Sequence, residues 1–164
     1  MRAPTVAPFN HSLSPLLVML ALVAGCEGVI TGKEVVTVAL QPTGDGGYGP
    51  VKFALGPDMN PVAINLHANY SQDRQESGKW NTYRATLKVG AKQIATRDFN
   101  VNYPAAAGSD ASSPPPTSLV HTLWIVDLKD RDDYEVTIAP LKPVEVTLVS
   151  PRIEVRRNVQ RPPA

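Results

Sequence analysis

Apolar residues recur at every second position along much of the sequence, and this alternation is the feature that most restricts the fold. Apolar side chains at the even positions of Val62–Tyr70 alternate with mostly polar ones such as Asn65 and His67. A period of two is typical of a half-buried β-strand, whereas a helix repeats about every 3.6 residues. The 16 prolines and 11 glycines interrupt the chain too often for ordinary helices. The pattern predicts an all-β protein with strands in residues 36–40, 51–55, 62–70, 79–89, 93–103, 118–128, 134–139, 144–149 and 152–157.

The clearest pair of strands lies in Tyr83–Tyr103. Alternation runs to residue 89, Gly90 and Ala91 supply a turn, and the alternation then resumes. Ile94 and Ala95 are out of phase with it, which predicts a β-bulge or an early twist in a β-hairpin.

This hairpin, with the residues SGKW (77–80) before it and Tyr83 inside it, resembles the paired strands of bacterial immunoglobulin-like domains. The resemblance and the many short strands imply an immunoglobulin-like β-sandwich of about seven to nine strands. In such domains this hairpin usually closes the fold, whereas about 60 residues follow it here. Residues 118–128 are apolar on both faces, which predicts a central strand that is covered on both sides.

A low-complexity stretch rich in proline, alanine and serine, residues 104–117, divides the strand signals. It cannot bury a face, so we expect a surface loop. The 47 residues after it are close to the size below which a domain without disulfides seldom folds alone. The sequence therefore predicts one domain over residues 34–157 that contains this loop, followed by a disordered tail in residues 158–164.

The N-terminus carries one cation, Arg2, and then an apolar run, Leu13–Ala24, which ends near Cys26, the single cysteine of the chain. A membrane-spanning helix needs about 20 apolar residues, so this run is too short to span and is typical of a secretion signal. A lone thiol in a secreted chain has no partner for a disulfide, and a modification would account for it.

The order of residues 22–26, LVAGC, resembles the lipobox of bacterial lipoproteins, which is an aliphatic residue, two small residues and a cysteine. The resemblance implies a signal peptide in residues 1–25, cleavage between Gly25 and Cys26, a diacylglycerol thioether and an acyl chain such as palmitate on Cys26, and a tether in residues 26–33. Glu27 implies delivery to the outer membrane, with the domain on the periplasmic face. The alternative that remains open is an ordinary signal peptide that is cleaved somewhere near Cys26.

Charge and composition exclude some functions. Removal of residues 1–25 takes away one of the 16 bases, Arg2, and no acid, which leaves 15 bases against 15 acids. A nucleic-acid binder would carry a basic excess, so none is expected as a partner. His67 and His121 stand alone in strand patterns, which predicts ordinary strand histidines and no metal or cofactor. No nucleophile motif is present, so we do not expect an enzyme.

Two charged clusters are candidate sites. Carboxylates in the turn 127–133 could bind calcium, although a solvated turn is the simpler interpretation. Arginines near the C-terminus could contact phosphates of lipid headgroups or an acidic partner, although an edge strand protected by charge explains them as well. The residues are Asp127, Asp130, Asp132 and Asp133 in the first cluster and Arg152, Arg156, Arg157 and Arg161 in the second.

We therefore expect a lipid-anchored lipoprotein of the cell envelope, with a membrane contact through its lipid, an envelope protein as partner, and a binding or scaffolding role. The alternatives are a small lipoprotein subunit of an envelope-spanning secretion assembly and, less favoured, a hydrolase based on carboxylates.

Overall fold

Eight β-strands and two single-turn 3-10 helices make up the described part of the chain. The computed structural model describes residues 31–71, 73–103 and 118–161, and no α-helix occurs among them. The prediction of an all-β sandwich with about seven to nine strands is confirmed. The elements are β1 (Lys33–Ala39), β2 (Tyr48–Leu55), η1 (Pro57–Met59), β3 (Val62–Tyr70), η2 (Arg74–Glu76), β4 (Trp80–Val89), β5 (Lys92–Asn102), β6 (Ser118–Val126), β7 (Asp132–Pro140) and β8 (Leu148–Arg157).

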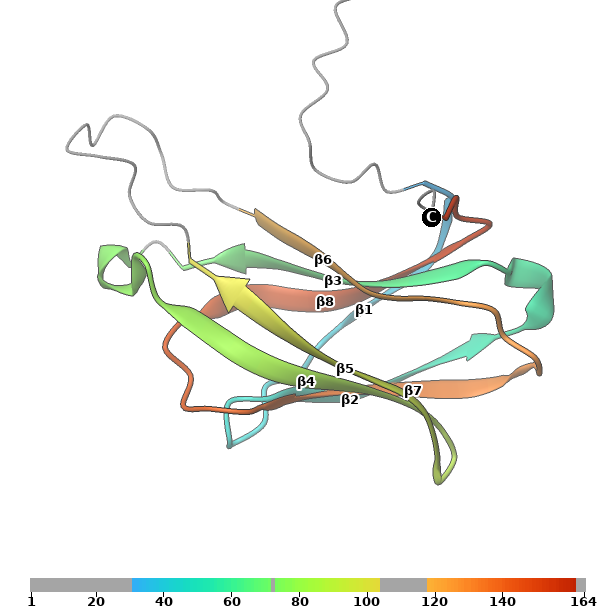
Figure 1. Ribbon diagram of the computed structural model, residues 1–164, viewed down its shortest axis with the longest axis horizontal. Coiled ribbons are helices and arrows are strands. Elements are labelled where there is room, and N and C mark those ends of the chain that lie inside the picture. The colour runs from blue at the N-terminus through green and yellow to red at the C-terminus, as the bar shows by residue number, and fades with distance from the viewer. Residues whose placement is uncertain (1–30, 72, 104–117, 162–164) are drawn as a thin grey trace, which may run out of the picture.

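The strands form two antiparallel four-stranded sheets that pack face to face (Figure 1). Sheet A has the order β1-β8-β3-β6, and sheet B has the order β2-β7-β4-β5. Their inner faces supply fully buried side chains such as Leu66 and Ile153 from sheet A and Tyr83 and Val136 from sheet B. Burial of these alternating residues is the main source of stability of the fold.

The connectivity is that of an eight-stranded jelly roll. Successive strands pass from one sheet to the other, and β4 and β5 are the only consecutive strands within one sheet of the described chain. In an immunoglobulin domain the first two strands are neighbours in one sheet, whereas β1 and β2 lie in different sheets here. The immunoglobulin-like resemblance therefore extends to the sandwich architecture and not to the order of the strands.

The predicted hairpin and its bulge are confirmed. β4 pairs with β5 along its whole length, from Trp80 opposite Asn102 to Val89 opposite Lys92. The register shifts where Leu87 pairs with Ala95 and Lys88 pairs with Gln93, so that Ile94 is the extra residue.

The prediction that residues 118–128 form a central strand is wrong, because β6 lies at the edge of sheet A and, among the described strands, pairs with β3 alone. A bulge explains the misleading pattern. Trp124 pairs with Ile64 and Thr122 pairs with Asn65, so Leu123 is an extra residue and the inward phase changes from odd to even positions. A shift of phase within one strand makes both of its faces look apolar in the sequence.

The two strands predicted in residues 144–149 and 152–157 are also not separate. A single strand, β8, runs through both Ser150, whose φ is 51°, and Pro151. Residues 144–147 form a loop, in which Val146 is fully buried and exchanges hydrogen bonds with the side chain of Asn81. The amide of Asn81 thus replaces a neighbouring strand as the partner of this backbone.

Both described ends of the chain are packed against the sandwich, in contrast to the tether and disordered tail that the sequence predicts. Val159 is buried, and its N–H donates to the carbonyl of Pro61. The N–H of Gln160 donates to Oγ1 of Thr31 at 2.7 Å. Residues 158–161 and 31–32 are therefore part of the fold.

Candidate functional site

The outward side chains of β4 and β5 form a polar surface, which we call the β4–β5 face. It exists because the alternate residues of both strands are buried in the core, for example Tyr83 and Phe99. Opposed pairs of outward side chains cross the two strands. They are Trp80 and Asn102, Thr82 and Asn100, Arg84 and Asp98, and Thr86 and Thr96.

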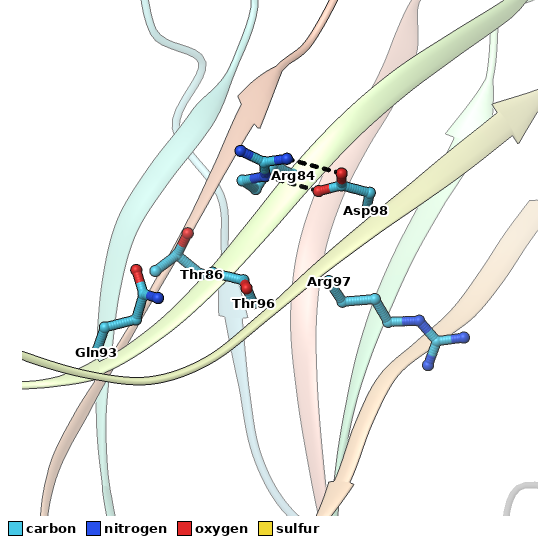
Figure 2. Close-up of a pocket in the computed structure, with 6 residues that line it drawn as sticks. All are labelled: Arg84, Thr86, Gln93, Thr96, Arg97 and Asp98. Carbon is cyan, nitrogen blue, oxygen red and sulfur yellow. Dashed lines mark hydrogen bonds and ion pairs between the residues drawn. The ribbon is translucent and has the colours of Figure 1, made fainter.

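A shallow depression of about 450 Å³ lies on this hairpin (Figure 2). Its lining includes a bidentate ion pair in which Nε and Nη2 of Arg84 donate to the two carboxylate oxygens of Asp98 at 2.7 and 2.8 Å. The hydrogen bonds from Arg84 hold the pKa of Asp98 below its usual range. A carboxyl held in its ionised form is a poor general acid. The lining residues are Arg84, Thr86, Gln93, Thr96, Arg97 and Asp98.

Large apolar side chains are exposed at one end of the β4–β5 face. Trp80 is 49% exposed, Leu141 is 45% exposed and Val144 is 40% exposed. Leu141 is next to β4, since its N–H donates to the carbonyl of Thr82. Nζ of Lys142 lies 3.9 Å from the centroid of the Trp80 ring. We call Trp80, Leu141 and Val144 the distal patch. Trp80 begins β4, and Leu141 and Val144 lie in the loop that leads from β7 into the start of β8. Lys33 pairs with Arg157 at the other end of β8, and β1 and β4 begin at opposite ends of the sandwich (Figure 1).

A buried carboxylate, Glu154, organises the outer face of sheet A. Its Oε2 accepts hydrogen bonds from Nε2 of His67 at 2.7 Å and from Nδ2 of Asn65 at 3.3 Å. Its Oε1 accepts from Nη1 of Arg156 at 2.7 Å. A carboxylate only accepts, so Nε2 of His67 carries the hydrogen. Oγ1 of Thr122 donates to Oδ1 of Asn65, which links β6 to this network.

Two opposing effects act on the pKa of Glu154. Burial by itself raises the pKa, but the hydrogen bonds from Arg156, His67 and Asn65 outweigh burial and hold the pKa below the usual 4.5. The carboxylate is therefore stable in its ionised form inside the network. We assign the cluster a structural role, because Glu154 is buried and each of its two oxygens already accepts a hydrogen bond from within the protein.

The four arginines predicted as an anionic contact are placed differently from one another. Arg156 is bound to Glu154 and also donates to the carbonyls of Thr31 and Gly32. Arg161 forms an ion pair with Asp127. The side chains of Arg152 and Arg157 make no ion pair within residues 31–71, 73–103 and 118–161.

The structure does not gather the carboxylates predicted for calcium into one centre. Asp127 is paired with Arg161, and Oδ1 of Asp132 accepts from the N–H of Asp133. Asp130 contributes its backbone carbonyl, which accepts from the hydroxyl of Tyr134. No group of three or more histidine, cysteine, aspartate or glutamate side chains that could hold a metal occurs in the described part of the chain.

His121 lies under the open edge between β5 and β6. Its ring stacks on Phe99 with centroids 4.9 Å apart, and burial, followed by the charge of Arg97, lowers its pKa. Its Nε2 is buried and has no hydrogen-bond partner among the described residues.

The predicted lipidation and cleavage positions, Gly25 and Cys26, lie outside the described residues.

Comparisons with known proteins do not place this chain in a family. No protein-family model matches it, and no curated protein matches it. In the part of the chain that the structure covers, no helix is both long enough and apolar enough to cross a membrane. The class of protein that the fold defines is an eight-stranded jelly-roll β-sandwich.

Sequence reasoning missed the residues that organise the two faces. Glu154 and Asn65 occupy outward strand positions, where polar residues are the rule, so the sequence does not show that both are buried. Arg84 and Asp98 are 14 residues apart and meet only across the hairpin. The sequence could have predicted this ion pair, because the two residues carry opposite charges and occupy paired positions of the predicted hairpin.

Proposed function

We propose that this protein is a lipid-anchored lipoprotein of the cell envelope, at the outer membrane, whose jelly roll binds an envelope protein in a role that is not catalytic. The lipobox-like residues 22–26 support the anchor. The position of the fold is compatible with it, since β1 begins at Lys33, seven residues after Cys26.

The observation that carries the binding role is the distal patch. A half-exposed tryptophan at the same end of the sandwich as two exposed aliphatic side chains is typical of a surface that another protein covers. The loop that contains two residues of the patch leads into the start of β8, whereas Lys33 pairs with Arg157 at the end of β8, so an anchor at Cys26 would leave the patch accessible. The polar depression that Arg84 and Gln93 help to line lies on the same hairpin that begins at Trp80, and its side chains would provide hydrogen bonds to a partner.

The test uses the full-length tagged protein, purified from detergent-solubilised membranes. We expect Trp80→Ala to reduce the amount of bound partner about tenfold or more, since tryptophan hot spots contribute about 2 kcal/mol or more. Trp80→Phe should retain part of the binding, and Val120→Ala, an exposed position on sheet A, should retain all of it. Mass spectrometry of the same preparation should show lipid on Cys26.

Equal retention of partner by wild type and Trp80→Ala would remove the distal patch as the binding surface. An unmodified Cys26, or cleavage elsewhere, would replace the anchor with an ordinary signal peptide. Recovery of a single partner supports a binding lipoprotein. Recovery of a large complex of fixed composition, lost in Trp80→Ala, would instead favour the second candidate, a subunit of an envelope-spanning secretion assembly, which the same patch would suit.

A further inference from the structure

The segment that follows the proposed anchor is held in place by Arg156. Nε of Arg156 donates to the carbonyl of Thr31 at 3.0 Å, and Nη2 donates to the carbonyl of Gly32 at 2.8 Å. The remaining nitrogen, Nη1, is held by Glu154, and the tail residue Gln160 donates to Thr31. The segment that precedes β1 therefore joins the sandwich at a defined point, beside the start of β1 and the end of β8.

This clamp limits the distance between the domain and an anchored Cys26. Thr31 is five residues after Cys26. Since an extended chain spans at most about 3.3 to 3.6 Å per residue, the clamped segment can stand no more than about 18 Å from the lipidated residue. A lipid anchor would thus hold the start of β1 and the end of β8 close to the headgroups of the bilayer.

Two cations stand opposite each other at this point. Lys33 begins β1, Arg157 ends β8, and the two residues are directly paired across the strands. Neither side chain forms an ion pair with another described residue. Like charges directly opposite each other repel, so an anion that binds both would relieve the repulsion.

The acids at this end of the sandwich do not neutralise the pair. Asp58 and Asp127 are each bound to an arginine, Arg131 and Arg161 respectively. Asp130, Asp132 and Asp133 form no ion pair with another described residue, and they belong to the β6–β7 connection and the start of β7, in sheet B. Lys33 and Arg157 belong to sheet A, and the two sheets of a sandwich lie about 10 Å apart.

Glu34, next to Lys33, lies opposite Arg156 and accepts a hydrogen bond from Thr37.

We infer that Lys33 and Arg157 bind the phosphates of anionic lipid headgroups and so orient the domain on the membrane with its distal patch outward. The inference rests on the proposed lipidation of Cys26. Arg156 is a positioning residue in this arrangement, because it holds the chain and not the lipid. The effect is electrostatic and therefore requires anionic lipid and low or moderate salt.

The test measures orientation by energy transfer on reconstituted, lipidated full-length protein. A donor dye is placed at Val35→Cys, near Lys33, or at Val144→Cys, in the distal patch; both positions are exposed. Lipidation consumes the thiol of Cys26, so the new cysteine is the reactive one. The acceptor dye is on lipid headgroups, in vesicles of phosphatidylcholine alone or with phosphatidylglycerol.

With phosphatidylglycerol we expect strong transfer from position 35 and weak transfer from position 144. The clamp keeps position 35 near the headgroups on every vesicle, so position 144 reports the orientation. Lys33→Gln with Arg157→Gln should raise transfer from position 144 to its value on phosphatidylcholine vesicles, where the domain is not held upright. Lys52→Gln with Lys88→Gln removes the same charge from the outer face of sheet B and should change nothing. Transfer from position 144 that is unaffected by the first pair, or raised equally by both pairs, would overturn the inference. Mass spectrometry of each sample shows whether Cys26 carries lipid, so a failure of the proposed anchor is recognised separately.

Discussion

At the scale of single residues, Glu154 shows how a charge is accommodated on a buried part of a sheet surface. Its two oxygens accept from Asn65, His67 and Arg156, and only 7% of the residue is exposed. Glutamine has the same shape, but its amide nitrogen would face one of these donors. An unsatisfied buried donor costs more than a lost hydrogen bond between exposed groups.

We expect Glu154→Gln to lower the free energy of unfolding at neutral pH by about 1 to 3 kcal/mol. The pKa of Glu154 in the folded protein is below the usual 4.5, so its ionisation stabilises the fold fully above pH 4.5. This contribution is lost as the pH falls through the lowered pKa. The difference between the two proteins in denaturant titrations should therefore shrink below pH 4.5.

Glu34→Gln is the matched control, since Glu34 is an exposed glutamate of β1 that accepts from Thr37 alone among the described residues. It should leave the unfolding free energy within about 0.5 kcal/mol of wild type. A Glu154→Gln protein as stable as this control at pH 7 would show that the network contributes nothing to stability.

At the scale of elements, the side chain of Arg97 bridges the open edge between β5 and β6. Nη1 of Arg97 donates to the carbonyls of Thr122 and Leu123, at 3.2 and 3.0 Å, where the bulge of β6 exposes them. β6 is the edge strand of sheet A and β5 is the edge strand of sheet B. Arg97 thus connects the sheets and places a charge at an edge that could otherwise pair with another chain.

We expect Arg97→Gln to destabilise β6 locally by about 1 kcal/mol, seen as faster hydrogen exchange of its amides. The same change should raise the pKa of His121, followed by NMR, because the charge of Arg97 contributes to lowering it. Burial is the larger cause, so the pKa should stay below the usual 6.5.

Arg84→Gln, on the opposite face of the same hairpin, should leave both measurements unchanged. If Arg97→Gln left the pKa of His121 and the exchange of β6 as they are in wild type, the proposed link between the two edges would be wrong.

At the scale of the whole molecule, the strands before and after residues 104–117 are interleaved. β7 lies between β2 and β4, and β8 lies between β1 and β3. The apolar faces of β6, β7 and β8 are covered by strands from the earlier part of the chain, so neither part has a core of its own.

We expect residues 118–164, expressed alone, to show no cooperative thermal transition by circular dichroism. Cleavage of the full-length folded protein within residues 105–116 should yield two fragments that remain together in size-exclusion chromatography, because their strands share both sheets. Full-length, uncleaved protein is the control. A cooperative transition of the isolated fragment would refute the single domain.

The strand content of this protein and its hairpin could be predicted because both depend on local periodicity. The segments around Tyr83 and Val62 alternate without interruption, and both became strands close to their predicted bounds. Predictions failed where a bulge changed the phase, at Leu123, and where Asn81 supplied hydrogen bonds to a loop. The pairing of Glu154 with His67 depends on contacts 87 positions apart, which no local pattern encodes.

By itself, the sequence determined that the chain forms a β-sandwich, because side-chain alternation and frequent turn residues act within each segment. It also carries the lipobox-like residues that end at Cys26. Only the tertiary structure decided which strands are neighbours, that β6 is an edge, that Glu154 is buried, and that Lys142 lies over the ring of Trp80 at one end. These features depend on the packing of two twisted sheets, in which the partner of each strand is selected by burial across the whole molecule.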